Sequence, residues 1–310
     1  MRGMSACRQV ATDTLMELAA KDRDIIAVTS DARGSATLKA FVAAYPEQFV
    51  ECGIAEQNEV AMAAGLARCG KKPFICAPAP FLSSRSLEQI KVDAAYSNTN
   101  VKLLGVSGGV SYGPLGGSHY CTQDIAAVRA IAGMTVLVPA DGPQTAWLVR
   151  ELARRVGPTY TRMGRNPVPE VYAWDESFTW GRAKLLREGG DVTIIACGQM
   201  VYYAVQAADL LAESGIRARV LDMYMIKPLD REAVLAAARE TRGIVTVEEH
   251  SILGGLGSAV AEVVVQEQPT RMKLMGIPDG PFTYGSQLEM FAAMGLTAEN
   301  IAANAKALVV

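Results

Sequence analysis

The amino-acid sequence predicts an α/β protein with two successive open α/β domains, each built on a mostly parallel sheet. Short apolar runs of strand character alternate with segments of helical periodicity along the chain, which is the pattern of βαβ units. The alternation is interrupted once, over 165–190, where two prolines and two tryptophans occur and no period is clear. We therefore expect a first domain at 1–170, a linker at 171–187 and a second domain at 188–310.

The first domain contains six apolar runs that we interpret as strands, with a helical segment before or after each. The last helix has the clearest boundaries, because Asp141 can cap it, Pro143 lies in its first turn and Gly157 follows it. The expected strands are 25–29, 49–52, 73–77, 101–106, 135–138 and 159–161, and the expected helices are 5–20, 35–44, 55–69, 83–96, 122–131 and 143–156.

The second domain repeats the same alternation after the break. Its helical segments carry apolar residues at intervals of three and four, and its strands are short and rich in Val, Ile and Leu. The expected strands are 192–196, 218–221, 244–247 and 273–275, and the expected helices are 201–213, 230–239, 257–266 and 297–307.

Composition excludes several classes of protein. The chain has 310 residues, half of them hydrophobic and a fifth charged, with a net charge of −2. The lack of basic runs argues against nucleic-acid binding, and no apolar stretch approaches the roughly 20 residues of a membrane span. Six scattered cysteines without CxxC spacing suit a reducing cytoplasm, and with only two histidines we predict no metal site of the usual zinc type.

Glu56 lies where a predicted strand gives way to a predicted helix. The run 49–52 is strand-like, and small or apolar residues at helical spacing follow from Val60 until Gly70. An acid in the first turn of a helix can simply answer the helix dipole, which is worth about 0.3–1 kcal/mol. The edge of an open α/β sheet is also where such folds bind ligands, so Glu56 is a candidate functional acid as well.

A glycine-rich loop at 107–119 is the second candidate. It follows a predicted strand, contains five glycines and ends at His119. Its glycines match neither the Walker nor the dinucleotide fingerprint, and a plain connecting loop is the alternative. Loops of this length in compact domains are often functional, and His119 could act as a general acid or base.

Three further segments have plainer explanations. Phe81 follows a strand and could stack on a planar cofactor, although an isolated aromatic residue more often belongs to the core. The run 248–250, Glu-Glu-His, ends a predicted strand, where we expect a solvated charged edge. The glycines of 254–257 precede a helix without the Lys-Ser/Thr of a phosphate loop, so we expect close helix–strand packing there.

Together these segments resemble the C-terminal half of a transketolase, a member of a thiamine diphosphate enzyme family. The resemblance covers essentially the whole chain: residues 1–165 are similar to the pyrimidine-binding domain, and 188–310 to the C-terminal domain. The matching motifs are FVECGIAEQN at 49–58, GMTVLVPAD at 133–141, IKPLD at 226–230 and VEEH…GGLG at 247–257.

The resemblance implies roles for individual residues. Glu56 matches the glutamate that shares a proton with N1′ of the cofactor's aminopyrimidine, and Phe81 matches the aromatic residue that stacks on that ring. His119 matches the histidine that contacts the substrate near the reacting carbons. Guanidinium groups bind phosphate in a bidentate manner and are always charged. The positions that bind the sugar phosphate in the family are matched by Arg8, Ser35 and Arg162.

The sequence departs from the family pattern near the substrate. The usual Asp-Gly-Pro-Thr-His reads LGGSH at 115–119, so Leu115 replaces a substrate-facing aspartate. Ser107 stands where a second histidine is common, and Ser84 stands where a tyrosine often lies near the pyrimidine. The donor is therefore expected to differ from a standard pentose phosphate, for example as a branched or otherwise modified ketose phosphate.

The chain also lacks the Gly-Asp-Gly…Asn motif that holds the diphosphate of the cofactor and its Mg²⁺ in this family. The resemblance thus implies the C-terminal subunit of a split transketolase, a glycolaldehyde transferase that moves a two-carbon ketol unit from a ketose phosphate to an aldose phosphate. A separate N-terminal subunit would hold most of the Mg²⁺ site, and the expected complex is α2β2, with thiamine diphosphate between the chains.

Related architectures leave other interpretations open. Deoxyxylulose phosphate synthases and the β subunits of 2-oxo acid dehydrogenases share this domain arrangement, and the latter would act on a 2-oxo acid. A non-catalytic, degenerate pair of domains that serves regulation or assembly is a further alternative. The retained Glu56, Phe81 and His119 argue against decay of the site.

Overall fold

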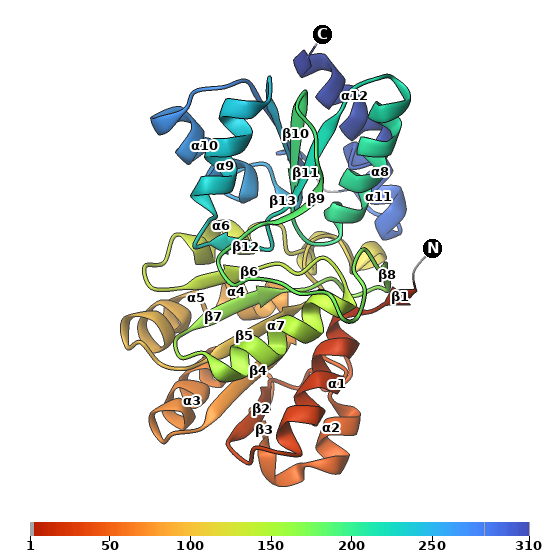
Figure 1. Ribbon diagram of the computed structural model, residues 1–310. Coiled ribbons are helices and arrows are strands. Elements are labelled where there is room, and N and C mark those ends of the chain that lie inside the picture. Colours follow the sequence, from red (N-terminus) through yellow and green to blue (C-terminus); the bar gives the residue numbers. More distant parts are fainter. Residues whose placement is uncertain (1–2, 282, 310) are drawn as a thin grey trace.

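A seven-stranded sheet is the centre of the N-terminal half of the chain, which occupies the lower part of Figure 1. The computed structural model describes residues 3–281 and 283–309. All neighbouring strands of this sheet run parallel except the first pair, which is antiparallel. In spatial order, the strands are β12 (Met225–Lys227), β6 (Thr135–Leu137), β7 (Thr159–Arg162), β5 (Lys102–Val106), β4 (Lys72–Pro78), β2 (Ile25–Thr29) and β3 (Phe49–Glu51).

Helices cover both faces of this sheet, which is why strands β2 and β5 are buried throughout. One face packs against α1 (Cys7–Ala19), α2 (Lys39–Ala44) and α7 (Gly142–Arg154). The other face packs against α3 (Glu56–Arg68), α4 (Ala79–Arg85), α5 (Leu87–Gln89) and α6 (Asp124–Arg129). A small antiparallel pair, β1 (Met4–Ser5) with β8 (Val168–Pro169), joins the beginning of the domain to its end.

A five-stranded sheet forms the upper body in Figure 1. Its strands are parallel except for the last pair, and helices again lie on both faces. The strand order is β14 (Met272–Ile277), β13 (Ile244–Ser251), β10 (Val192–Ala196), β11 (Ala218–Asp222) and β9 (Lys184–Arg187). One face carries α8 (Met200–Glu213), α11 (Gln287–Met294) and α12 (Ala298–Val309), and the other carries α9 (Arg231–Glu240) and α10 (Leu256–Glu267).

The predicted strands of both sheets are confirmed, with boundaries that shift by a few residues. Three differences bear on the organisation of the chain. The expected linker 171–187 ends in strand β9, which belongs to the second sheet. Strand β12 follows the first strands of the second sheet in sequence, yet pairs with β6 and completes the first sheet. The expected helix 83–96 is divided into α4, α5 and a π-helical segment, Ile90–Tyr96.

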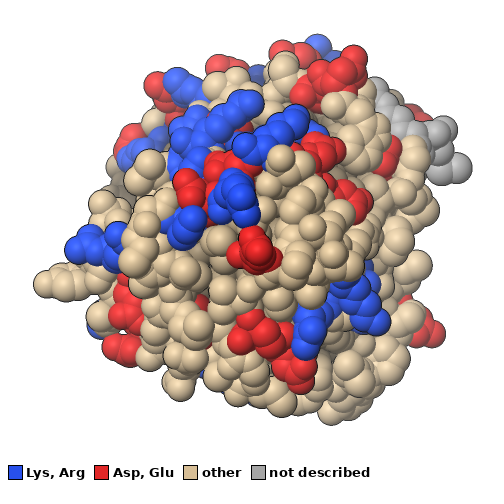
Figure 2. Space-filling model, turned by 90° about the horizontal axis from the view of Figure 1, so that it is seen from below, with Lys and Arg blue, Asp and Glu red and all other residues tan. Residues whose placement is uncertain are grey.

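Charged side chains of both signs are interspersed over the lower end of the molecule, as Figure 2 shows. Exposed ion pairs such as Arg23–Glu47, 3.0 Å, and Lys71–Asp24, 2.8 Å, join opposite charges at the surface. Solvent screens such pairs, so each contributes about 1 kcal/mol or less to stability. In the described part of the chain, no helix combines the length and the apolar character needed to cross a membrane.

Candidate active site

Glu56 is the first residue of α3, just beyond the end of β3, where the sequence placed it. The segment 53–55 turns the chain from strand to helix, with Gly53 at φ +68°. The Glu56 side chain is only 6% exposed, yet it borders a hollow of about 690 Å³ together with Ile54 and Arg85. The helix dipole favours a negative charge at this position, and the open space in front of it leaves room for a ligand.

Arg85 occupies part of that space. Its Nη1 donates a hydrogen bond to Glu56 Oε1 at 2.7 Å, and its guanidinium carbon lies 4.4 Å from the centre of the Phe81 ring. A planar group that donates an N–H to the Glu56 carboxylate and stacks on the Phe81 ring could therefore take the place of the Arg85 guanidinium. A protonated aminopyrimidine is such a group, so the residues present suit the ring of a thiamine cofactor.

His119 extends the row of rings away from Glu56. Its imidazole lies 5.4 Å from the Phe81 ring and 5.2 Å from the Tyr112 ring, centre to centre, both nearly edge-on. The glycine-rich loop places it there through a short 3-10 helix, Gly113–Ser118, and Ser118 Oγ lies 3.0 Å from His119 Nδ1. The structure thus places the rings of Phe81 and His119 in contact.

A pair of arginines closes the row. The guanidinium of Arg165 lies over Tyr112, 5.0 Å from the ring centre. Arg8 donates through Nε to the Arg165 carbonyl at 2.9 Å and through Nη1 to the Ser35 carbonyl at 2.7 Å. Partial burial, and then the nearby charge of Arg165, lower the pKa of Arg8. Two such cations side by side can bind an anion. Arg165 Nη1 has a free N–H for it, because this atom is buried and has no hydrogen-bond partner among the described residues.

Arg162, the arginine expected from the sequence to contact the phosphate, lies three residues before Arg165 and has different surroundings. Arg162 is 4% exposed, and its Nε lies 3.1 Å from Asp124 Oδ2 while Nη2 donates to the carbonyls of Cys121 and Glu249. Burial works against its charge, but the carboxylates of Asp124 and Glu249 outweigh that effect and raise the pKa of Arg162. The guanidinium of Arg162 thus has its partners inside the protein, and its contact with a substrate phosphate stays a prediction.

The acidic end of β13 is buried, so the expected solvated edge is wrong. Glu248 accepts hydrogen bonds from the amides of Leu256 at 2.7 Å and Gly257 at 2.8 Å, at the start of α10. His250 Nε2 accepts from the amide of Ala126 in the first domain at 3.3 Å. His250 thus lies at the junction of the two domains, and the sequence pattern of its own strand does not show that the first domain covers it. The glycines of 254–257 do pack closely, since a Cβ on Gly255 would lie 2.0 Å from Glu248 Oε2.

The positions that depart from the family pattern lie around the same loop. Ser107 is fully buried at the end of β5, with a φ of +62°, and its hydroxyl has no partner among the described residues. Leu115 is exposed on the short 3-10 helix. Ser84 is exposed on α4 and lies 3.3 Å from Gln123 Nε2.

Two family models match the chain in the expected order. Residues 4–170 match the transketolase pyrimidine binding domain, and residues 181–301 match the transketolase C-terminal domain. The chain is 54% identical over 299 residues to a subunit of the apulose-4-phosphate transketolase of Phocaeicola vulgatus, covering 96% of each chain. It is 39% identical over 294 residues to a 6-deoxy-6-sulfo-D-fructose transketolase subunit of Clostridium sp. strain MSTE9, covering 95% of this chain and 91% of the relative.

Solved structures agree with this assignment. The chain superposes on a split gene transketolase described as an inactive β4 tetramer with a TM-score of 0.89 and 40% identity, over 99% of this chain and 100% of the other. A 1-deoxy-D-xylulose-5-phosphate synthase of Heliobacterium modesticaldum also matches, at 38% identity, but the chain spans only 46% of that enzyme. Thiamine diphosphate dependence follows from the family. The chain belongs to the transketolase family, and it is the C-terminal subunit of a split transketolase.

Proposed function

We propose that this subunit, together with an N-terminal subunit, transfers a two-carbon ketol unit from a modified ketose phosphate to an aldose phosphate. The observation that carries the proposal is the continuous row from Glu56 through Phe81 and His119 to Arg165. Neighbouring members of this row are joined by the contacts of 2.7 to 5.4 Å described above. A buried carboxylate stands at one end and two cations stand at the other, which matches a cofactor ring at one end and a sugar phosphate at the other.

Each residue in the row has a chemical task in this proposal. Thiamine diphosphate, when bound, supplies a carbanion that attacks the donor carbonyl and an electron sink for the cleaved fragment. The Glu56 carboxyl holds a proton at N1′ of the pyrimidine, a role that suits an acid shielded from water. Phe81 stacks on the pyrimidine ring and orients it, and His119 contacts the donor sugar beside the cofactor. Arg8 and Arg165 hold the phosphate and so fix the distance of the donor carbonyl from the cofactor.

The donor we propose is apulose 4-phosphate. Two relatives carry that name, the subunit of Phocaeicola vulgatus at 54% identity and one from Actinobacillus succinogenes at 39% identity over 280 residues, covering 90% of each chain. Leu115 and Ser107, on the loop that ends at His119, differ from the residues usual in the family, which favours a donor of different shape.

The active assembly we propose is an α2β2 complex in the cytoplasm. The N-terminal subunit would supply the diphosphate and Mg²⁺ ligands, because the chain carries no Gly-Asp-Gly…Asn motif. The solved relative of 40% identity is a tetramer of β chains that is described as inactive, which supports the need for a second kind of subunit. The six cysteines are all free thiols, as suits a reducing compartment.

The test is reconstitution of the chain with its candidate N-terminal subunit, thiamine diphosphate and Mg²⁺, followed by a substrate panel. The panel contains apulose 4-phosphate, xylulose 5-phosphate, unphosphorylated apulose and pyruvate, each with an aldose phosphate acceptor where needed. We expect apulose 4-phosphate to give the highest kcat/KM. Glu56→Gln should lower kcat at least about 100-fold, the typical loss of a general acid–base group, without loss of assembly.

Glu47→Gln is the matched control, because Glu47 is exposed and pairs only with the surface residue Arg23 among the described residues. It should leave kcat unchanged. Turnover of pyruvate alone would favour the dehydrogenase alternative, and near-normal activity of Glu56→Gln would reject the role of Glu56.

A further inference from the structure

The glycine-rich loop that carries Tyr112 and His119 is held from the second domain. The amide of Val110 donates to Glu249 Oε1 at 2.9 Å. The hydroxyl of Tyr120, which follows His119, lies 2.8 Å from the carbonyl oxygen of Gly113 in the same loop and 3.1 Å from that of Thr283 in the second domain, so these two acceptors share its one proton. The ring of Tyr284 lies so close to Gly116 that a Cβ there would be 2.1 Å from Cε1. The loop therefore lies between the two domains and contacts the second domain directly.

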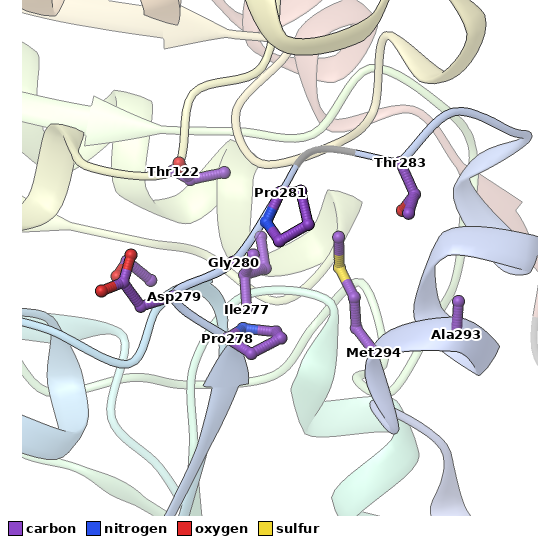
Figure 3. A pocket seen from close by; sticks show the side chains of 10 residues that line it. Thr122, Ile277, Pro278, Asp279, Gly280, Pro281, Thr283, Ala293 and Met294 are labelled. Carbon is purple, nitrogen blue, oxygen red and sulfur yellow. The ribbon is translucent and has the colours of Figure 1, made fainter.

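Apolar packing at this junction is incomplete. Figure 3 shows Thr122, from the first domain, on one side of a hollow of about 240 Å³, with Pro278 and Met294 of the second domain on the other. The hollow lies beside the junction, and the loop 107–119 is joined to the second domain by hydrogen bonds outside it.

The carboxylate of Glu249 is the centre of these hydrogen bonds. Glu249 lies on β13 and is 5% exposed. Its Oε1 accepts from Val110 and, at 2.9 Å, from Gln287 Nε2, while its Oε2 accepts from Gln199 Nε2 at 2.6 Å. Gly109 has a φ of +64°, and a Cβ there would lie 2.2 Å from the carboxyl carbon of Glu249. Only glycine lets the loop approach the carboxylate this closely.

The same carboxylate also reaches the other end of the proposed sugar phosphate site. Gln287 accepts a hydrogen bond from Asn166 Nδ2 at 2.8 Å, and Asn166 directly follows Arg165. One buried group is thus linked through Val110 to the loop with His119, and through Gln287 to the segment with Arg165. Neither Glu56 nor Phe81 is a hydrogen-bond partner in this network.

We propose that Glu249 is a positioning residue that sets the separation between His119 and Arg165, and with it the fit of the donor sugar phosphate. The second domain then acts in substrate recognition from outside the site, through this carboxylate. The inference rests on the proposed function, because it gives His119 and Arg165 their roles at the substrate. Replacing Glu249 should therefore change the binding of the donor sugar phosphate and leave the binding of the cofactor unchanged.

The experiment compares Glu249→Ala with Glu248→Ala in the complex with the N-terminal subunit. Glu248 is a matched control, because it is a neighbouring buried carboxylate of β13 whose hydrogen bonds go to the start of α10 instead of the loop. Hydrogen–deuterium exchange should become faster at 108–119 and 164–167 in Glu249→Ala, and at 254–258 in Glu248→Ala. The KM for the donor should rise about tenfold in Glu249→Ala only, as expected for the loss of charged hydrogen bonds, with the Kd of thiamine diphosphate unchanged in both.

Glu249→Gln provides the rescue. Its amide oxygen can still accept from Val110, and Gln199 can turn its own amide to accept from the new NH2 group. In Glu249→Gln, the KM for the donor should return close to the wild-type value, and hydrogen exchange in the loop should again be slow. If Glu249→Ala leaves exchange at 108–119 unchanged, or if both alanine variants raise the KM equally, the positioning role is rejected. If the wild-type complex has no ketose phosphate activity but the exchange pattern appears, the proposed function fails and the anchoring of the loop stands.

Discussion

Arg85 occupies the place that our proposal gives to the aminopyrimidine of the cofactor. Its guanidinium is planar and cationic, donates to Glu56 at 2.7 Å and stacks 4.4 Å above Phe81. The aminopyrimidine in our proposal needs the same carboxylate and the same ring face. Since the Arg85 side chain is about half exposed, it can leave toward solvent when the cofactor arrives. Until then it neutralises Glu56, which is buried beside an open hollow.

Replacing Arg85 should therefore ease cofactor binding. In the assembled complex, Arg85→Met should lower the Kd of thiamine diphosphate by up to about fivefold, since a half-exposed ion pair is worth at most about 1 kcal/mol. Isothermal titration calorimetry measures this change, with Arg85→Lys as the control that keeps the charge and loses the planar stacking group. A weaker affinity in Arg85→Met would mean that Arg85 stays beside the bound cofactor and helps to hold it.

Helix α3 carries a second acid one turn after Glu56. Glu59 is fully buried, and neither of its carboxyl oxygens has a hydrogen-bond partner among the described residues. Burial raises the pKa of Glu59 to about 8, from an ordinary value of 4.5, with a smaller opposite effect of the Ser30 hydroxyl and a further rise from Glu56. At neutral pH the group is therefore largely uncharged, and α3 does not place a second negative charge beside Glu56.

This buried acid makes the stability of the chain depend on pH. Between pH 4.5 and about 8 the folded chain keeps a proton that the unfolded chain has released, so the free energy of unfolding falls as pH rises through this window. Glu59→Gln removes that dependence. Urea unfolding should give Glu59→Gln a free energy of unfolding that exceeds the wild-type value by several kcal/mol at pH 8 and by little at pH 5. The expected size follows from about 1.4 kcal/mol for each unit by which the pKa is raised. An equal gain at both pH values would point to packing instead of proton binding.

The elements of the chain were predictable where a local pattern decides them. The strands of both sheets and helix α7, capped by Asp141 through the amide of Gln144, follow from apolar periodicity and caps. Strand β12 has three residues and crosses to the other sheet, so only the tertiary fold reveals it. Helix α11 could have been found from its capping box, because Ser286 and Glu289 bond to each other's backbone amides.

The candidate site divides in the same way. Glu56 and Phe81 stand beside strand ends in sequence, so motif and position identify them together. The choice between Arg162 and Arg165 cannot be made from sequence, because Arg162 is the last residue of β7 and Arg165 comes only three residues later. In the structure, Asp124 of α6 pairs with Arg162 in the interior, whereas Arg165 lies beside Arg8, and our proposal therefore uses Arg165. The burial of Glu249 depends in the same way on a loop 139 residues away.

At the scale of the whole molecule, the two domains are joined by shared structure. Strand β12 from the second half of the chain lies in the first sheet. The buried side chains of Arg162, Glu249 and His250 each make hydrogen bonds across the junction. Because these groups lose their partners if the domains separate, we expect the chain to move as one unit.

The last prediction concerns that interface. In our proposal, Glu56 and Phe81 contact only the pyrimidine end of the cofactor, and the sequence has no motif for the diphosphate and Mg²⁺. The diphosphate carries most of the cofactor's charge, so its ligands should supply most of the binding free energy. We expect calorimetry to show binding of thiamine diphosphate at least about 100-fold weaker to the chain alone than to the complex, a difference of about 2.7 kcal/mol, with or without Mg²⁺. Glu56→Gln should weaken binding to the complex much less, because it removes only one hydrogen bond to the ring. Tight binding and turnover by the chain alone would show that it holds the whole cofactor and needs no second subunit.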